Sequence, residues 1–387
     1  MCGIFGYAGS RPAADLIHTG LKRLEYRGYD SWGIALRSQE DILLTKHTGA
    51  LAAESGLEGS TPTVGIGHTR WATHGGVTDV NAHPHMATDG SFALAQNGIV
   101  ENYQELKEQL LAGGYSFISE TDTEVIVRLI EEERKHADSL AEAVRRAFVK
   151  LDGRNTVIVL PLAGDECDLI AVRNGSPLVA GRAADGIFIA SDTLSFADQT
   201  DEVLLLENNE MIVLAGSEIK VLDARSGNPI SRSFETINHE DSTIDKEGYP
   251  HFMLKEIHEQ QHTIREAMRY SQHELQPFAE ACRQARTIYT VGAGTAGYAA
   301  GQIAYYLRTI AGLRAFELKA YEIDSFTEGF SADDIIIGVS QSGETADTIE
   351  ALEFAAQAGV RIASIVNMRG STIPRMSQWS FFYQVRS

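Results

Sequence analysis

The second residue of the chain is a cysteine, and a thiol at that position can act as a nucleophile. Removal of Met1 would leave Cys2 with a free α-amine beside its own thiol. An α-amine has an ordinary pKa of about 7.7–8.0 and a thiol one of about 8.5, so the amine is suited to act as general base for the thiol, directly or through one water. Cys2 is therefore a candidate catalytic nucleophile.

Five further segments carry polar side chains at a density that a scaffold alone would not need. They are residues 24–31, 67–75, 81–85, 96–102 and 119–124. Together with residues 1–4 they closely resemble the N-terminal-nucleophile glutaminase domain of class II glutamine amidotransferases, over nearly all of residues 2–238. The forms Arg-Gly-Tyr-Asp-Ser (27–31) and His-Thr-Arg-Trp-Ala-Thr-His-Gly (68–75) resemble in particular the glutamine–fructose-6-phosphate aminotransferases, also called glucosamine-6-phosphate synthases.

The resemblance implies a catalytic set for the hydrolysis of L-glutamine. Cys2 would attack the side-chain amide carbon of glutamine and form a thioester. The oxyanion that develops needs rigid neutral donors, which the Asn97 side-chain amide and the Gly98 backbone N–H would supply. A glycine suits position 98 because the backbone must approach closely there.

The same resemblance implies a pocket for the rest of the glutamine molecule. Arg70 would bind the α-carboxylate with its guanidinium, Thr73 would add a hydroxyl, and Asp122 would bind the ammonium group. Trp71 would act as a lid that excludes water and retains ammonia. The remaining residues expected to support the pocket are His74, Arg27 and Gly28.

Four histidines raise the question of a metal, and the sequence argues against one. The set is His68, His74, His83 and His85. No acidic or cysteine partner stands at ligand spacing from them, and in the resembled family they shape loops. We therefore predict no metal and no other cofactor.

A second group of hydroxyl side chains lies near residue 340, where a predicted strand gives way to a helix. Hydroxyls and backbone N–H groups at a helix N-terminus can hold a phosphate without cations. Residues 340–348 (Ser-Gln-Ser-Gly-Glu-Thr-Ala-Asp-Thr) resemble the sugar-isomerase (SIS) domain, and residues 292–295 resemble its first glycine turn. The side chains that would bind fructose 6-phosphate are Thr295, Ser340, Gln341, Ser342 and Thr345.

The glycine turn departs from two known patterns. Gly292, Gly294 and Gly297 fit the dinucleotide spacing, but no acidic residue follows about 20 positions later at a strand end, which argues against NAD. Ala296 stands where the SIS family commonly has a serine that contacts the sugar phosphate, so one hydroxyl is missing.

Composition limits the partners and the compartment. The 387 residues include 33 Lys and Arg against 53 Asp and Glu, a net charge of −20, which disfavours nucleic acid and anionic membranes as partners. The three cysteines are too few and too widely spaced for a disulfide framework. Because neither a signal peptide nor a long apolar run is visible, we expect a soluble cytoplasmic protein.

The elements that must position these residues differ between the two parts of the chain. Before residue 238, short β-rich runs are interrupted by two helical stretches, 13–24 and 122–151, which predicts an α+β layered domain. The resemblance makes this an αββα N-terminal-nucleophile hydrolase fold. After residue 250, strands and helices alternate, which predicts an α/β doubly wound, flavodoxin-like sheet.

We therefore expect three segments: a glutaminase domain at 2–237, a linker at 238–250, and a first SIS domain at 251–387 that is incomplete at its C-terminal end. The second sugar lobe of the family, which carries the isomerase residues, is expected to be absent from this chain. A homodimer, or association with a chain that supplies that lobe, would then be needed for the full transferase reaction.

Two alternatives remain open from the sequence. The glutaminase could feed ammonia to another acceptor, as in purine phosphoribosyl amidotransferases or asparagine synthetase, although neither a phosphoribosyl-diphosphate loop nor an ATP loop is visible. The chain could also be a non-catalytic regulatory protein that binds a sugar phosphate. The presence of Cys2, Asn97, Gly98 and Asp122 argues against that reading.

Overall fold

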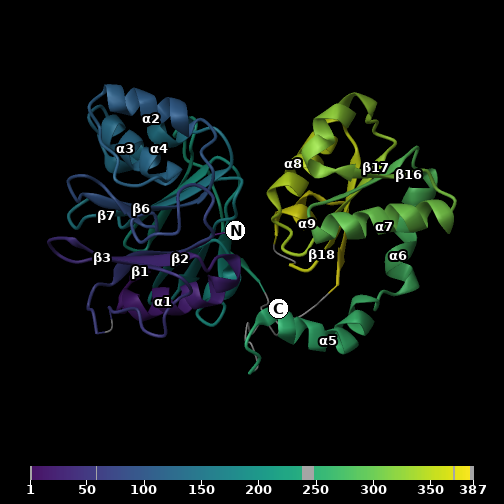
Figure 1. The fold of residues 1–387 in the computed structure, drawn as a ribbon, viewed down its shortest axis with the longest axis horizontal. Coiled ribbons are helices and arrows are strands. Elements are labelled where there is room, and N and C mark those ends of the chain that lie inside the picture. Colours follow the sequence, from purple (N-terminus) through teal and green to yellow (C-terminus); the bar gives the residue numbers. More distant parts are fainter. Residues whose placement is uncertain (1, 58, 238–247, 369–370, 384–387) are drawn as a thin grey trace. The chain divides into compact units, whose positions relative to one another are not determined.

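The structure, a computed structural model, describes residues 2–57, 59–237, 248–368 and 371–383. The chain forms two compact units, Met1–Asp241 and Ser242–Ser387 (Figure 1). Most of the expected linker, residues 238–247, lies outside the described residues. The domain limits expected from the sequence stay a prediction.

The first unit contains two antiparallel sheets that pack face to face. The eight-stranded sheet has the order β14 (Glu235–Thr236), β11 (Glu202–Leu205), β9 (Val179–Ala183), β10 (Gly186–Ala190), β1 (Gly3–Gly9), β4 (Val64–Arg70), β2 (Ser31–Arg37), β3 (Ile42–Thr48). The six-stranded sheet has the order β13 (Glu218–Asp223), β12 (Glu210–Ala215), β8 (Leu169–Asn174), β7 (Asn155–Pro161), β6 (Phe92–Gly98), β5 (His85–Met86). Apolar side chains of both sheets, such as Ile66 and Ile158, form the core between them.

Helices cover the outer faces of both sheets. Helix α1 (Ala13–Leu24) packs on the eight-stranded sheet, with Ile17 and Leu21 in its core. Helices α2 (Tyr103–Ala112), α3 (Asp122–Arg134) and α4 (Leu140–Val149) contribute to the core on the outer side of the six-stranded sheet. The short helices η1 (Glu25–Arg27) and η2 (Thr193–Phe196) complete the unit. The predicted αββα layering is confirmed.

Helix α2 was not predicted. Only Leu106 and Leu110 of its ten residues are buried, so the sequence carries a weak apolar period there.

Strand β4 presents different residue types to its two faces, because side chains alternate along a strand. A Cβ at Gly65 or Gly67 would lie within 2.8 Å of Ile17, so glycine at both positions lets α1 pack closely. The other face carries Val64, Ile66, His68 and Arg70. This row runs from the core between the sheets to the end of the strand, where polar side chains replace apolar ones.

The second unit begins with α5 (Phe252–Ala267) and α6 (Gln272–Gln284) and continues into a five-stranded parallel sheet. Its order is β16 (Ala315–Lys319), β15 (Ile288–Gly292), β17 (Ile335–Ser340), β18 (Arg361–Val366), β19 (Trp379–Phe382). The connecting elements are α7 (Thr295–Thr309), η3 (Ala320–Gly329), α8 (Ala346–Gln357) and α9 (Thr372–Met376). The predicted doubly wound sheet is confirmed, while the expected truncation of this domain stays a prediction.

Both faces of this sheet are covered. Ile335 and Ile337 of β17 pack in one core with residues of α6 and α7, whereas Ile336 packs in the other with residues of α8. The strand order reverses between β15 and β17, which are neighbours. In doubly wound sheets, ligands bind at the carboxyl ends of the strands at such a reversal.

Candidate active site

Cys2 lies beside the end of β4 because of the antiparallel register of β1 and β4. Gly3 pairs with Thr69, so the residue before β1 meets the residues that follow β4. The half-buried Cys2 Sγ accepts a hydrogen bond from the Trp71 backbone N–H at 3.2 Å. Burial raises the pKa of the Cys2 thiol, while the Trp71 N–H and the positive charge of Arg70 act to lower it. These two lowering groups stabilise a thiolate.

Asn97 comes to Cys2 from the other sheet. It is buried near the end of β6, and its Nδ2 donates to the Cys2 carbonyl oxygen at 3.1 Å. Gly98 follows with φ of 121°, and a Cβ there would lie 1.9 Å from the Arg154 carbonyl oxygen. Both the backbone angle and the close approach require glycine at this position.

His68 contacts the oxygen end of the same Asn97 amide. Its Nε2 lies 2.9 Å from the Gln96 carbonyl oxygen and 3.1 Å from Asn97 Oδ1. The His68 ring centroid is 4.3 Å from that of His83, which in turn is 5.1 Å from that of His85. Burial lowers the pKa of His68 to about 3 and those of His83 and His85 well below their ordinary value. All three rings are therefore neutral near pH 7.

None of these histidines belongs to a metal-binding group. Within the described ranges, no set of three or more His, Cys, Asp or Glu side chains is arranged to hold a metal ion. His74 lies outside the cluster of His68, His83 and His85 and contacts the ring of Tyr103, with centroids 5.0 Å apart.

The buried guanidinium of Arg70 holds the loop that follows β4. It donates to the carbonyl oxygens of His74, Gly75 and Gly76, the last at 3.2 Å. Thr73 lies exposed on the same loop, and Trp71 is 45% exposed with its ring 5.6 Å from that of Tyr29. The structure therefore places Thr73 on a loop that is anchored by Arg70, the other residue expected to bind the carboxylate.

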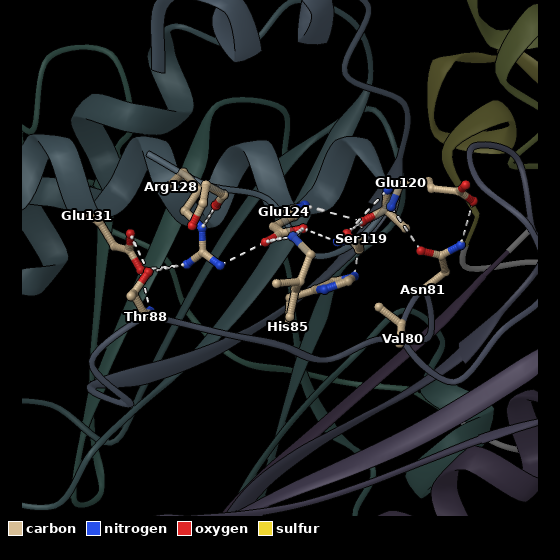
Figure 2. Close-up of polar contacts among 12 residues, drawn as sticks. Val80, Asn81, His85, Thr88, Ser119, Glu120, Glu124, Arg128 and Glu131 are labelled. Atoms are coloured by element: carbon tan, nitrogen blue, oxygen red, sulfur yellow. Dashed lines mark hydrogen bonds and ion pairs between the residues drawn. The ribbon is translucent and has the colours of Figure 1, made fainter. Parts of the chain in front are cut away.

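Asn81 and Glu120 clamp the far end of this loop (Figure 2). Asn81 Nδ2 donates to the Gly76 carbonyl oxygen at 3.0 Å, and the Gly76 N–H donates to Glu120 Oε2 at 3.1 Å. The two side chains also bond to each other, and the Glu120 N–H donates to Asn81 Oδ1 at 3.0 Å. Both the donor and the acceptor of the Gly76 backbone are thus satisfied by side chains.

A buried carboxylate fixes the segment that carries Glu120. Glu124 accepts from the backbone N–H groups of Ile118 and Ser119 and forms an ion pair with Arg128 at 2.8 Å. Figure 2 shows Arg128 between Glu124 on one side and Thr88 and Glu131 on the other. This chain of contacts connects the loop clamp to the body of α3.

Asp122 begins α3 and contacts the segment that follows the predicted oxyanion residues. It is buried, and its Oδ2 accepts from the Val100 N–H at 2.8 Å. Because Val100 is two residues beyond Gly98, this bond ties the predicted ammonium-binding carboxylate to the segment after β6.

Arg27 and Gly28 are both expected to support the glutamine pocket, and the structure gives them different kinds of contact. The buried Arg27 guanidinium forms an ion pair with Asp192 at 2.7 Å, and Tyr26 donates to the same carboxylate at 2.7 Å. A Cβ at Gly28 would lie 2.7 Å from the Arg70 carbonyl carbon and 2.8 Å from the Trp71 nitrogen. Gly28 therefore packs directly against the peptide that donates to Cys2.

The second unit places its hydroxyl residues at the carboxyl ends of β15 and β17. Ser340 Oγ accepts from the Gly343 N–H at 3.0 Å and lies 2.9 Å from Thr345 Oγ1, at the start of α8. Ser342 Oγ accepts from the Glu344 N–H at 3.1 Å, and Gln341 is exposed. Thr295, also exposed, begins α7 after β15. Two helix N-termini thus meet at the strand reversal, an arrangement that suits an anion.

Comparison with known proteins finds one matching domain family in each part of the chain. The glutamine amidotransferase domain family matches residues 45–149, and the SIS domain family matches residues 282–384. Glutamine–fructose-6-phosphate aminotransferases [isomerizing] from Thermus thermophilus and Methanococcus maripaludis are 40% and 38% identical to the chain over 97% of its length. The chain contains a glutamine amidotransferase domain and a SIS domain. It spans 63% and 64% of the length of these two relatives.

Solved structures share the fold at low sequence identity. The B. subtilis glutamine phosphoribosylpyrophosphate amidotransferase complexed with ADP and GMP is 18% identical, with a TM-score of 0.52 over 94% of this chain and 81% of that one. A structure described as the allosteric regulatory enzyme of purine biosynthesis is 20% identical, with a TM-score of 0.54 over 94% of this chain and 80% of that one.

Several residues of the first unit lie around the site but are not singled out by the sequence analysis. They are Asp30, which accepts from the Ala72 N–H at 2.8 Å, together with Asn81, Glu120 and Asp192. The sequence analysis gives His68 only a loop-shaping role. Its spacing of two residues from Ile66, on the same face of β4, is the signal that could have placed it in the row leading to Arg70.

Proposed function

We propose that this chain hydrolyses L-glutamine to glutamate and ammonia through a thioester on Cys2. The observation that supports this best is the meeting of Cys2 Sγ, the Trp71 N–H and the Asn97 amide at the ends of β1, β4 and β6. These groups supply a nucleophile, a donor that stabilises its thiolate, and a neutral donor for an oxyanion.

The proposed reaction has two stages. The Cys2 thiol gives its proton to the α-amine of the processed N-terminus, and the sulfur bonds to the amide carbon of glutamine. The tetrahedral oxyanion accepts hydrogen bonds from Asn97 Nδ2 and the Gly98 N–H. The carbon–nitrogen bond then breaks, and the leaving nitrogen takes the proton back to depart as ammonia. A water molecule next gives one proton to the α-amine as its oxygen bonds to the thioester carbon, the carbon–sulfur bond breaks, and the sulfur takes that proton to regenerate the Cys2 thiol as glutamate leaves.

Arg70, Thr73 and Asp122 are proposed to hold the amino-acid end of glutamine. Arg70 anchors the loop 71–76, and Thr73 is exposed on that loop. Asp122 accepts a hydrogen bond from the Val100 N–H. A guanidinium and a buried carboxylate are the groups suited to an α-carboxylate and an ammonium.

A second part of the proposal concerns the acceptor of ammonia. The names of the relatives and the hydroxyl-rich turn at Ser340 support fructose 6-phosphate as the sugar and glucosamine 6-phosphate as the product, in amino-sugar synthesis. The turn would bind the phosphate through Ser340, Ser342 and Thr345 at the N-terminus of α8. Gln341 lies in the same turn, and Thr295 is the first residue of α7.

The proposed setting is cytoplasmic, with self-association through the SIS unit. All three cysteines are free, and no helix among the described residues has the length and apolar character to cross a membrane. Helix α7 and the residue that follows it expose large apolar side chains, with Tyr298 of the helix 80% and Ile310 just beyond it 78% exposed, which favours a protein partner. Light scattering of the purified chain tests this: a dimer supports it, and a monomer at micromolar concentration contradicts it.

Ammonia release from L-glutamine tests the glutaminase directly. The full chain should release ammonia, and Cys2→Ala should abolish release, whereas Cys167→Ala, which changes a buried cysteine in another part of the unit, should leave it intact. Undiminished release by Cys2→Ala would refute the assignment. Calorimetry with fructose 6-phosphate separates the functions: binding of the sugar without Cys2-dependent ammonia release would indicate a regulatory protein instead.

A further inference from the structure

We propose that His68 is a positioning residue that fixes the orientation of the Asn97 side-chain amide, so that its NH2 group points to the Cys2 side. This inference rests on the proposed glutaminase function. Asn97 is the predicted oxyanion donor, and an amide can act as a donor only in one of its two orientations. If the amide turned over, its oxygen would face the developing oxyanion and repel it.

The contacts of Asn97 determine which way the amide points. The Cys2 carbonyl oxygen can only accept, so the atom 3.1 Å from it is Nδ2. Asn97 Oδ1 then lies 3.1 Å from His68 Nε2 and needs a donor. The Gln96 carbonyl oxygen, 2.9 Å from the same nitrogen, also needs one. A proton on His68 Nε2 serves both acceptors, and no other tautomer of the neutral ring serves either.

The other ring nitrogen is consistent with this tautomer. Among the described residues, His68 Nδ1 is buried and has no hydrogen-bond partner. A buried N–H without a partner is costlier than an unused acceptor, so the proton belongs on Nε2. The ring is also neutral, because burial lowers its pKa to about 3, with the positive charge of Arg70 acting in the same direction.

The cluster of His68, His83 and His85 holds the His68 ring in place. His83, whose ring lies 4.3 Å from that of His68, is itself fixed by Thr123 Oγ1 at 3.0 Å and by the Gln96 N–H. The His85 ring packs edge-on against that of His83, and its Nε2 lies 3.1 Å from Thr121 Oγ1. Rings from β4 and from residues 83–85 therefore pack against β6 and the start of α3. His68 is one fixed donor in a fully buried cluster.

A matched pair of substitutions separates the hydrogen bond from the volume. His68→Leu removes the donor, and it should lower kcat of glutamine hydrolysis about 100-fold while KM changes less than about threefold, because the lost effect belongs to the oxyanion. His68→Gln keeps an N–H near the Nε2 position and should retain activity within about fivefold. His18→Leu, which removes a histidine bonded to the Ala52 carbonyl oxygen, is the control and should change neither constant.

A double-mutant comparison tests whether His68 acts through Asn97. In the Asn97→Ala background, His68→Leu should cost less than about threefold in kcat, because there is no amide left to orient. Equal losses in both backgrounds would overturn the proposal, since a general packing defect lowers activity in either one.

A spectroscopic measurement on the unchanged chain keeps the proposal independent of activity. Long-range nitrogen–proton NMR of histidine-labelled protein should show His68 as the neutral Nε2–H tautomer from pH 8 down to about 5. A protonated ring or an Nδ1–H tautomer in that range would refute the proposed positioning. Absence of Cys2-dependent ammonia release would instead refute the glutaminase function, and the tautomer would still decide the geometry.

Discussion

Gly28→Ala offers a direct test of how the backbone around Cys2 sets its reactivity. Gly28 has an extended conformation, with φ of −170°, which alanine also adopts, so the substitution acts through space alone. The new Cβ would lie 2.7 Å from the Arg70 carbonyl carbon, 2.8 Å from the Trp71 nitrogen and 2.9 Å from the Arg70 carbonyl oxygen. All three are backbone atoms, so no side chain can move aside.

The size of the effect follows from these distances. Ordinary contacts begin near 3.4 Å, so the Arg70–Trp71 peptide must retreat by about 0.7 Å. A displacement of that size directly away from Cys2 would lengthen the Trp71 N–H bond to Cys2 Sγ from 3.2 Å to about 3.9 Å between heavy atoms, close to the 4.0 Å limit for a hydrogen bond to sulfur. A hydrogen bond to a charged group is worth about 1.5–3 kcal/mol, so weakening it should lower thiolate-dependent rates by up to roughly one to two orders of magnitude. Overpacking should also cost about 1–3 kcal/mol of stability.

Alkylation by iodoacetamide at fixed pH is the assay. Cys2 should dominate the reaction because its side chain is half-buried and the Trp71 N–H and Arg70 oppose the rise in pKa that burial causes, whereas Cys167 and Cys282 are buried and burial raises their pKa values to about 12 and 11. Gly28→Ala weakens a contact that lowers the pKa of Cys2, so alkylation and kcat should both fall.

The control is Gly329→Ala, where no atom lies within 4 Å of the added Cβ. Wild-type alkylation and turnover in Gly28→Ala would refute the reasoning.

Three further predictions concern other contacts. Asn81→Ala should raise KM for glutamine about tenfold with a smaller change in kcat, because it releases Gly76 from its clamp; steady-state ammonia assays check this, and an unchanged KM would show that the clamp is not needed. Ser340→Ala should weaken fructose 6-phosphate binding about tenfold by calorimetry, since it removes the hydroxyl that orders Gly343 and Thr345; equal binding would exclude this turn. Finally, His68, His83 and His85 have folded-state pKa values below the unfolded value of about 6.5, so the unfolded chain binds more protons below that pH. The free energy of unfolding of the first unit should therefore fall as pH drops from about 6.5 towards 3, by up to about 1.4 kcal/mol per pH unit for each histidine. His68→Gln should reduce that slope, which can be measured by urea unfolding with hydrogen exchange in β4 as the probe.

The sequence predicted those parts of the site whose chemistry resides in side chains. Cys2 is a candidate nucleophile from its residue type and position, whereas Asn97 and Asp122 follow from the resemblance of their segments to class II glutaminase domains, and the structure places all three at neighbouring strand and helix ends. The αββα layering of the first unit follows from the same resemblance, and the parallel second sheet from the alternation of strands and helices. Their assigned roles stay predictions.

The remainder depends on partners that leave no mark in the sequence. Arg70 donates to three backbone carbonyl oxygens, and Gly28 meets a backbone peptide, so neither contact has a complementary side chain to be recognised. Asn81 and Glu120 lie 39 positions apart, and the fold brings them together so that they bond to each other and to Gly76. The orientation of the Asn97 amide likewise depends on a histidine from the opposite sheet.

The burial of β4 has a consequence for how the site opens. All seven residues of this strand are buried, and it lies between β1 and β2 in the middle of its sheet, whereas residues 73, 75 and 76 just beyond it are exposed. Amides of central strands exchange with solvent only when the whole unit unfolds, while those of exposed loops exchange through small local openings. The loop 71–76 can therefore open and close many times within the lifetime of the folded unit. Glutamine, the proposed substrate, would enter and leave through such openings while His68 and Asn97 keep their geometry from one turnover to the next.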